Sequence, residues 1–394
     1  MNNPYFEFHN GVKLLCGETA LSRIAWELKQ LGASRPLVLS DAVLNRIGTL
    51  RRVVQAMEAE GCSPAGGFTD IPVDSSLAVV NRIAAYYRDL HCDALVAVGG
   101  GSVLDTAKGV RLVLSQEVDD LLSISGFESL PKGRDIPFIA VPTTCGTGSE
   151  CTGVAVIRND ETQVKMEFLS PYVEPDVAVL DPVMTESLPP KATASTGMDA
   201  LTHAIEAATC LQANPLSTAY ATAAMELLTQ HIVQATRCGS DKKARYAMAL
   251  GSTMAGISFS NSMVGLVHAI GHALGGVCHV PHAIAMMILL PHVMRYNLPK
   301  IASSYAALLP HLVGRETAEG TPVAERSGAA IAAVEALSAQ LSELTGLPRS
   351  LHEAGVTKDS FARVAEVAVN DGAIIVNPRA AGEAEILDIL NAAY

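Results

Sequence analysis

The pattern of apolar positions divides the chain into two parts of different character. Up to about residue 184, short apolar runs alternate with stretches of helical periodicity, and three of these runs are candidates for buried strands: PLVLSD (36–41), ALVAVGGG (94–101) and PFIAVPTT (137–144). This alternation is typical of a parallel sheet covered by helices. After LDPVMTESLPP, helical periodicity rich in alanine, leucine and methionine takes over. We therefore predict an α/β domain over residues 1–184 and an all-helical domain over residues 185–394.

Length and composition indicate two domains and no membrane-spanning segment. The chain has 394 residues, of which 49% are hydrophobic, and this suffices for two cores. The apolar run AIAMMILL (283–290) stops at Pro291, far short of the roughly 18 residues that a membrane-spanning helix needs. The start, MNNPYFEFHNGV, shows neither the basic nor the apolar segment of an export signal. We therefore expect a cytoplasmic protein that does not enter a membrane.

Charge and cysteine usage narrow the class of partner. The net charge of −12 opposes binding to nucleic acid or to anionic lipid. The eight cysteines form no C-x-x-C pair and no disulfide-scaffold spacing, so we interpret them as reduced thiols. The expected partner is therefore a small molecule.

A glycine-rich turn follows the second strand candidate. ALVAV runs into Gly99-Gly100-Gly101-Ser102, and the next residues, VLDTAKGVRLVL, have helical character. A helix that begins in glycines binds anions, because its free N–H groups and its dipole attract phosphate and the backbone can approach closely. Tight strand-to-helix turns use glycine for conformational reasons too, and the spacing is not G-x-G-x-x-G. This turn alone therefore leaves both interpretations open.

A second loop and an aspartate favour a nucleotide. PTTCGTGSE (142–150) places hydroxyls and glycines at the end of the third strand candidate. Asp41 ends the first one, where a carboxylate accepts hydrogen bonds from an adenosine ribose and repels a 2′-phosphate, which favours NAD over NADP. Alternatively, Asp41 only caps a helix that begins at Ala42. The residues themselves do not decide between these two roles.

Histidines gather in the helical half. GMDALTHAIEA contains Asp199 and His203, which are four residues apart and therefore on one helix face, where both could bind one ion. A lone histidine in an apolar helix is more often a packed core residue. Here, however, five of the eleven histidines fall within 25 residues that carry almost no charge: His268, His272, His279, His282 and His292. This clustering favours a metal site.

One ion can bind both His268 and His282 only if the helix between them breaks. Fourteen residues of unbroken helix separate two Cα atoms by about 21 Å, whereas ligand atoms lie about 2 Å from their metal. We predict that Gly275-Gly276 and Pro281 end one helix and redirect the chain. His268 and His272 are also four residues apart, so spacing alone does not choose between them as ligands.

Together these motifs resemble the iron-containing alcohol dehydrogenases, the group III family, over nearly the whole chain. The resemblance runs through the LSD strand end, GGGSVLDTAK, PTTCGTGSE and GMDALTHAIEA to NPRAAGEAEILDILNAAY, and its most specific part is DALTHAIE followed by H-x3-H-x9-H. It implies the fold shared with dehydroquinate synthase, in which an N-terminal α/β dinucleotide-binding domain with a parallel sheet and an all-helical, metal-binding C-terminal domain enclose the site. Relatives often form dimers or larger homo-oligomers, so we expect a homo-oligomer here.

The resemblance also implies residue roles. The metal, Fe(II) by family and Zn(II) or another divalent ion by ligand type, would bind Asp199, His203, His268 and His282, and His272 would be a catalytic residue near the nicotinamide. NAD(H) would be held by Asp41, Gly100, Gly101, Ser102, Asp105, Thr143, Thr144, Thr147 and Lys165. The sequence departs from the family at Ile71-Pro72-Val73-Asp74, where many relatives carry an asparagine. One contact on the adenosine side is therefore missing or replaced.

These implications predict a metal-dependent oxidoreductase that transfers a hydride between NAD(H) and a small aliphatic alcohol or its aldehyde. The metal would polarise the substrate oxygen, and His272 would help to move the proton. One alternative is a lyase similar to dehydroquinate synthase that uses NAD only transiently. Such a lyase needs a basic pocket for its substrate phosphate, and residues 197–294 contain few arginines and lysines. The other alternative is a non-catalytic, oligomeric relative.

Overall fold

The computed structural model describes residues 5–124, 130–162 and 165–394, which form two compact units. The sheet unit comprises His9–Leu188. The helical unit comprises Pro189–Tyr394 together with the described residues 5–8. The sequence pattern placed the boundary after residue 184, and the compact units divide after Leu188.

The sheet unit is built on a parallel sheet of six strands in the order β1-β8-β5-β4-β2-β3. These strands are Lys13–Cys16 (β1), Pro36–Leu39 (β2), Gly66–Phe68 (β3), Ala94–Gly99 (β4), Phe138–Pro142 (β5) and Val177–Leu180 (β8). The three runs predicted as strands form β2, β4 and β5, and all their strand residues are buried. Continuous apolar runs are expected in a sheet that is covered on both faces. The predicted fold class is confirmed.

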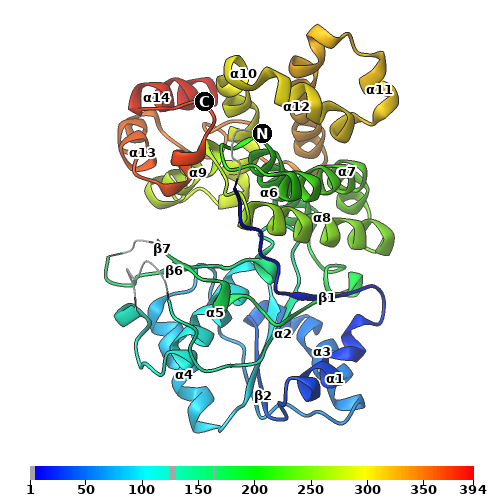
Figure 1. Ribbon diagram of the computed structural model, residues 1–394, viewed down its shortest axis with the longest axis vertical. Helices are drawn as coiled ribbons and strands as arrows, with labels where there is room; N and C mark the ends of the chain where they lie inside the picture. The colour runs from blue at the N-terminus through cyan, green and yellow to red at the C-terminus, as the bar shows by residue number, and fades with distance from the viewer. Residues whose placement is uncertain (1–4, 125–129, 163–164) are drawn as a thin grey trace. The chain divides into compact units, whose positions relative to one another are not determined.

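Helices cover both faces of this sheet (Figure 1). Successive strand residues alternate between the faces, so that Leu37 and Leu95 belong to one buried cluster and Val38 and Val96 to the other. The first cluster is completed by α4 (Leu77–Asp89) and α5 (Gly101–Ser115), and the second by α1 (Ile24–Gln30) and α3 (Thr49–Ala59). With both faces covered, the ends of the strands are the parts of the sheet that a ligand can reach.

The direction of the strand order reverses between β2 and β4. From β2 the chain passes outward to β3, and it then returns to β4 on the opposite side of β2. Ligands of open α/β sheets bind beyond the carboxyl ends of the strands at such a reversal. Asp41 follows β2 and the glycine turn at Gly100 follows β4. Two of the predicted cofactor segments therefore lie at the reversal.

A separate antiparallel pair, Val154–Arg158 (β6) and Lys165–Leu169 (β7), completes the sheet unit. The sequence pattern did not indicate it. β6 (VAVIR) has a short apolar run like those of the main sheet, but its residues alternate between half-buried and buried positions, and those of β7 are mostly exposed.

The regular structure of residues 189–394 is entirely helical: Pro190–Thr209 (α6), Pro215–Arg237 (α7), Lys242–Ser260 (α8), Leu266–Cys278 (α9), His282–Val313 (α10), Arg315–Gly320 (α11), Arg326–Thr345 (α12), Phe361–Ala368 (α13) and Glu383–Ala392 (α14), with short 3-10 segments between them. Helix α6 packs against α7, α8 and α10, and most of its residues are buried. The polar side chains of α6 therefore lie largely in the interior of the helical unit. Separately, none of the described helices is long and apolar enough to cross a membrane.

The helix breaks between His268 and His282, as their spacing required. Helix α10 begins at His282 directly after Pro281, as predicted. The prediction that the glycine pair 275–276 ends the preceding helix was wrong, because α9 continues through both glycines to Cys278. His279 ends it instead, in the left-handed conformation (φ 57°) that usually falls to glycine at a helix C-terminus.

Truncating a central strand residue should destabilise the protein strongly. Leu95 is 0% exposed on β4, which pairs with a strand on each side. We expect Leu95→Ala to lower the free energy of unfolding by about 2–5 kcal/mol in urea denaturation. The control Leu169→Ala alters a leucine that is 57% exposed, so its effect should stay below about 0.5 kcal/mol. Similar losses for both variants would contradict the described packing.

Candidate metal and dinucleotide sites

Helix α6 presents three polar side chains on one buried face. Asp199, His203 and Glu206 are separated by four and three residues, and side chains at these spacings project from the same side of a helix. All three are buried. The DALTHAIE segment therefore delivers two carboxylates and one imidazole to the interior of the helical unit.

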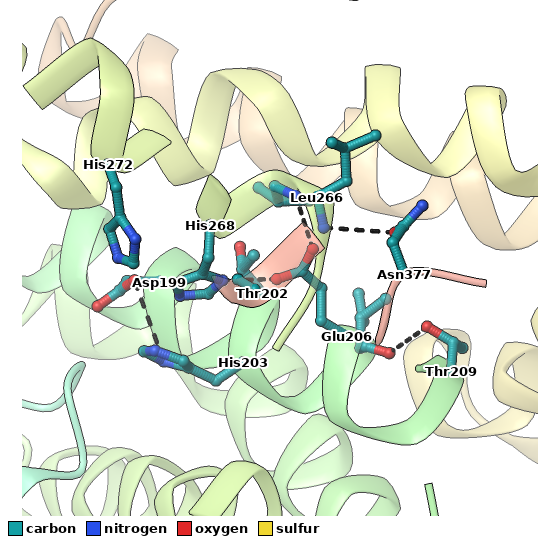
Figure 2. Close-up of polar contacts among 12 residues, drawn as sticks. Asp199, Thr202, His203, Glu206, Thr209, Leu266, His268, His272 and Asn377 are labelled. Atoms are coloured by element: carbon teal, nitrogen blue, oxygen red, sulfur yellow. Dashed lines mark hydrogen bonds and ion pairs between the residues drawn. The ribbon is translucent and has the colours of Figure 1, made fainter. Parts of the chain in front are cut away.

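Helices α9 and α10 bring two further histidines to this face. The ligand atoms of Asp199, His268 and His282 all lie within 4.8 Å of one another. His282 Nε2 is 3.4 Å from Asp199 Oδ1. His203 lies outside this group of three, but its Nδ1 is 4.0 Å from the same oxygen and its ring centre is 4.5 Å from that of His268 (Figure 2). All four residues expected at the metal therefore lie together.

The side chains at this place fit a divalent metal ion. Asp199 Oδ1, His203 Nδ1 and His268 Nε2 are buried and have no hydrogen-bond partner among the described residues. A buried polar atom without a partner costs roughly 1–3 kcal/mol, so three such atoms in one place fit a cation that they would bind in common. Imidazole and carboxylate are the ligand types that Fe(II) and Zn(II) accept.

The buried histidines are in the form that binds a metal. Burial lowers the pKa of His203 to about 3, and it lowers the pKa of His268 well below its ordinary value. Burial alone would raise the pKa of Asp199, but the imidazoles of His203 and His282 outweigh it and hold that pKa below its usual range. Neutral imidazoles and an ionised carboxylate are the required states of metal ligands.

Two histidines of α9 each have a carboxylate at Nδ1. His268 Nδ1 lies 2.5 Å from Glu206 Oε2, and His272 Nδ1 lies 2.9 Å from Asp371 Oδ2. With Nδ1 engaged, Nε2 is the nitrogen through which either ring would meet an ion or a substrate. Burial raises the pKa of Glu206 to about 7, against the opposing effect of the backbone N–H groups of Gly265 and Val267.

Sequence reasoning missed both carboxylates, for different reasons. Glu206 follows His203 by three residues on the same helix, so the helical spacing that selected Asp199 could have found it. Asp371 is 99 residues from His272, and no spacing connects the two. The His272 side chain is 34% exposed, whereas that of His268 is 3% exposed. Of these two histidines, His272 is therefore the one open to solvent.

In the sheet unit, the glycine turn and the second loop lie against each other. Gly100 is the N-cap of α5 and provides no side-chain cap, and the helix begins at Gly101. A Cβ atom would lie 3.0 Å from Thr144 Cγ2 at residue 100 and 2.9 Å from Thr147 Cγ2 at residue 101. Thr143 N donates to the carbonyl oxygen at the end of β4 (3.0 Å). The uncapped amides beside threonine hydroxyls fit a pyrophosphate group.

Asp105 and Lys108 fasten α5 to the second loop and to β6. The Ser149 hydroxyl donates to Asp105 Oδ1 at 2.6 Å. Lys108 is fully buried and donates to Thr152 Oγ1 (2.9 Å) and to Val154 O (2.7 Å). Asp105 thus meets the loop next to the glycine turn, and these bonds set where the loop lies relative to the start of α5.

Lys165 is linked to the glycine turn through Asp74. Lys165 Nζ lies 2.6 Å from Asp74 Oδ1, and Asp74 N donates to Ser102 Oγ at 3.2 Å. Asp74 belongs to the segment in which the sequence departs from the family pattern. This segment therefore contacts two of the expected cofactor residues.

Asp41 caps a helix in the structure. Its Oδ1 accepts hydrogen bonds from Val43 N and Leu44 N at the start of α2 (Ala42–Arg46). The capping role that the sequence allowed is therefore observed. A ribose contact by the same side chain stays a prediction.

Comparisons with known proteins match nearly the whole chain to one family. The sequence model of the iron-containing alcohol dehydrogenases matches residues 11–182, and that of the C-terminal part of the Fe-containing alcohol dehydrogenase family matches residues 193–394. The chain is 36% identical to a 1,3-propanediol dehydrogenase of Citrobacter freundii over 382 residues, 96% of each chain. It is 34% identical to an NAD-dependent methanol dehydrogenase of Bacillus methanolicus over 376 residues, 95% of this chain and 96% of the relative.

A solved structure of a 1,3-propanediol oxidoreductase has the same fold. Its TM-score is 0.92 at 34% sequence identity, and the match covers 99% of this chain and 100% of that chain. Fold, side-chain chemistry and relatives together define an oxidoreductase that acts on alcohols and aldehydes. The chain belongs to the iron-containing alcohol dehydrogenase family, as the sequence motifs predicted. The lyase and the non-catalytic alternatives are not favoured.

A divalent ion should stabilise the folded protein. A ligand that binds only the folded state adds about 2.7 kcal/mol at a 100-fold excess over its Kd. We expect Co²⁺ to raise the thermal midpoint of the metal-depleted protein, and Asp199→Ala to abolish this rise because it removes an anionic ligand. The control Asp388→Ala, an exposed carboxylate of α14, should keep the rise. An unchanged rise in Asp199→Ala would argue against the site.

Proposed function

We propose that this protein is an NAD(H)-dependent dehydrogenase that interconverts a small aliphatic alcohol and its aldehyde. The observation that carries the proposal is the group of buried atoms of Asp199, His203 and His268 that have no hydrogen-bond partner among the described residues. Two relatives named for short alcohols, one of them named as NAD-dependent, support the substrate and cofactor class.

We infer that Asp199, His203, His268 and His282 bind one divalent ion. When bound, such an ion acts as a Lewis acid that polarises a carbonyl oxygen toward hydride attack. The three neutral imidazoles donate lone pairs without adding charge, and the carboxylate of Asp199 cancels one of the two positive charges of the ion. The ligands therefore leave a net positive charge to attract the substrate oxygen. Fe(II) is the ion of the family name, and the ligand types suit Zn(II) as well.

We infer that the sheet unit binds NAD(H), which supplies or accepts the hydride. The support is the reversal of strand order at β2 and β4, together with the uncapped N-terminus of α5. The amides at the start of α5 would hold the pyrophosphate, Asp41 would meet the adenosine ribose, and the remaining expected residues would surround the nicotinamide half. In full, the proposed cofactor residues are Asp41, Gly100, Gly101, Ser102, Asp105, Thr143, Thr144, Thr147 and Lys165.

His272 is the proposed proton-transfer residue. Asp371 engages its Nδ1 and so orients the ring, and Nε2 would exchange a proton with the reacting oxygen through water or hydroxyl groups. Its side chain is partly exposed, unlike that of the neighbouring His268. The cytoplasmic location and the homo-oligomeric state expected above stay predictions.

Aldehyde-dependent NADH oxidation tests the proposed function. Protein purified without air, depleted of metal and reloaded with Fe(II) should oxidise NADH in the presence of short aliphatic aldehydes, with a rate that follows the bound iron. Asp199→Ala should show no turnover although its circular dichroism spectrum is native. Stoichiometric iron without turnover of any aldehyde in the panel would contradict the proposal.

Replacing His272 should slow turnover without loss of metal. General acid or base residues contribute typically 10²- to 10⁴-fold to rate, and we expect His272→Ala to lower kcat by about 100-fold while its iron content equals that of the wild type. The matched control is His352→Ala, an exposed histidine of the helical unit that contacts Tyr394, which should keep the wild-type kcat. Full activity of His272→Ala would remove His272 from the mechanism.

A further inference from the structure

Glu206 is a buried carboxylate that the function proposed above leaves without a role. It is 6% exposed, and both of its oxygens face donors of α9. Oε1 accepts the backbone N–H of Val267 at 2.7 Å, and Oε2 lies 2.5 Å from His268 Nδ1 (Figure 2). One side chain of α6 thus contacts both the backbone and a proposed ligand of α9.

The start of α9 depends on caps from other segments. Its N-cap is Gly265, which has no side chain to offer. The Val267 amide donates to Glu206, and the Leu266 amide donates to Asn377 Oδ1 at 3.3 Å. A Cβ atom at residue 265 would lie 3.0 Å from Glu206 Oε1 and 3.2 Å from Asn377 Oδ1. The glycine therefore allows both acceptors to approach the first turn.

A second buried amide fixes Asn377 in turn. Asn377 and Asn297 of α10 exchange hydrogen bonds between their side chains, at 2.9 and 3.0 Å, and both residues are buried. The acceptors at the start of α9 are thus connected to α10 and to the segment before α14. Because His268 lies in the first turn of α9, the same contacts determine where its ring lies.

The contact with Glu206 also selects the nitrogen that His268 offers. A metal ion at Nε2 requires the imidazole proton on Nδ1, and a carboxylate opposite Nδ1 is the acceptor that stabilises this tautomer. His268 Nε2 is the buried atom without a hydrogen-bond partner among the described residues, on the side of Asp199 and His282. The geometry of Glu206 therefore matches a ring turned toward an ion.

We propose that Glu206 is a positioning residue of the metal centre: it caps α9 and holds His268 with Nε2 directed at the ion. The inference rests on the metal-dependent function proposed above. Glu206 is not among the grouped ligand atoms of Asp199, His268 and His282. Its carboxylate contacts His268 Nδ1, and Figure 2 shows the His268 ring between Glu206 and Asp199.

Glu206→Gln separates this role from simple packing, because it preserves size. A glutamine has one acceptor oxygen and one NH₂ donor, so it satisfies only one of the two donors, Val267 N–H and His268 Nδ1–H. We expect the Kd for Co²⁺, measured by chelator competition on the metal-depleted full-length protein, to rise about 10- to 100-fold. The visible d–d absorption of the bound Co²⁺ should change as well, since the His268 ligand is displaced.

Glu226→Gln is the matched control. Glu226 of α7 pairs with His311 Nδ1 of α10 at 2.7 Å, so the substitution removes the negative charge from the same kind of carboxylate–imidazole contact in the same unit. Neither residue belongs to the proposed metal centre. The Kd for Co²⁺ and its spectrum should therefore stay at the wild-type values.

Gly265→Ala provides a second perturbation that leaves Glu206 in place. Its methyl group would push the Glu206 and Asn377 acceptors away by a few tenths of an ångström, so Co²⁺ binding should weaken here too. If Glu206→Gln does not fold, Gly265→Ala provides the test. A wild-type protein that fails to bind Co²⁺ would overturn the proposed function. If the wild type binds Co²⁺, and Glu206→Gln and Gly265→Ala both show the same Kd and spectrum as the wild type, the role of Glu206 is overturned while the proposed function stands.

Discussion

The arrangement of the helical unit centres on one buried carboxylate and two buried imidazoles. They belong to Asp199, His203 and His268, and each has one polar atom (Oδ1, Nδ1 and Nε2, respectively) that makes no hydrogen bond to the described residues. Because burying polar atoms without partners is costly, a cation bound by all three would stabilise them. Around them the helices pack closely: a Cβ on Gly197 of α6 would lie 2.6 Å from Ile232 of α7. The break between α9 and α10 brings His282 to Asp199, with His282 Nε2 3.4 Å from Asp199 Oδ1.

The expected ligand contacts are backbone groups in the sheet unit and side chains in the helical unit. In the sheet unit the expected contacts come from backbone amides at the start of α5 and from threonines packed on glycines, so the local turn geometry specifies them. In the helical unit the contacts are side chains that converge from α6, α9 and α10, and carboxylates fix two of the imidazoles at Nδ1. The metal centre proposed above needs fixed ligand directions, and the contact of Glu206 with His268 would supply one of them.

Local patterns in the sequence predicted the parts of the fold that local physics determines. The apolar runs of β2, β4 and β5, the pair Asp199 and His203, and the stop before Pro281 are of this kind. The glycine pair 275–276 misled because glycine tolerates a helix as well as ending one, and the left-handed residue fell on His279. The contacts of Asp371 with His272 and of Asn377 with Asn297 join residues far apart in the chain. The spacing of residues along one helix or strand cannot predict such distant pairs. The mostly exposed β7 has no apolar run from which a strand could be predicted.

Anomalous diffraction from crystals loaded with Fe(II) under anaerobic conditions tests whether Asp199, His203, His268 and His282 bind the metal. Data collected above and below the iron absorption edge locate the ion independently of any assumed ligand. We predict one strong peak about 2 Å from Asp199 Oδ1, His268 Nε2 and His282, with His203 as the fourth ligand. A peak at another place, or none in crystals that contain stoichiometric iron, would contradict the assignment of these four residues as the metal centre.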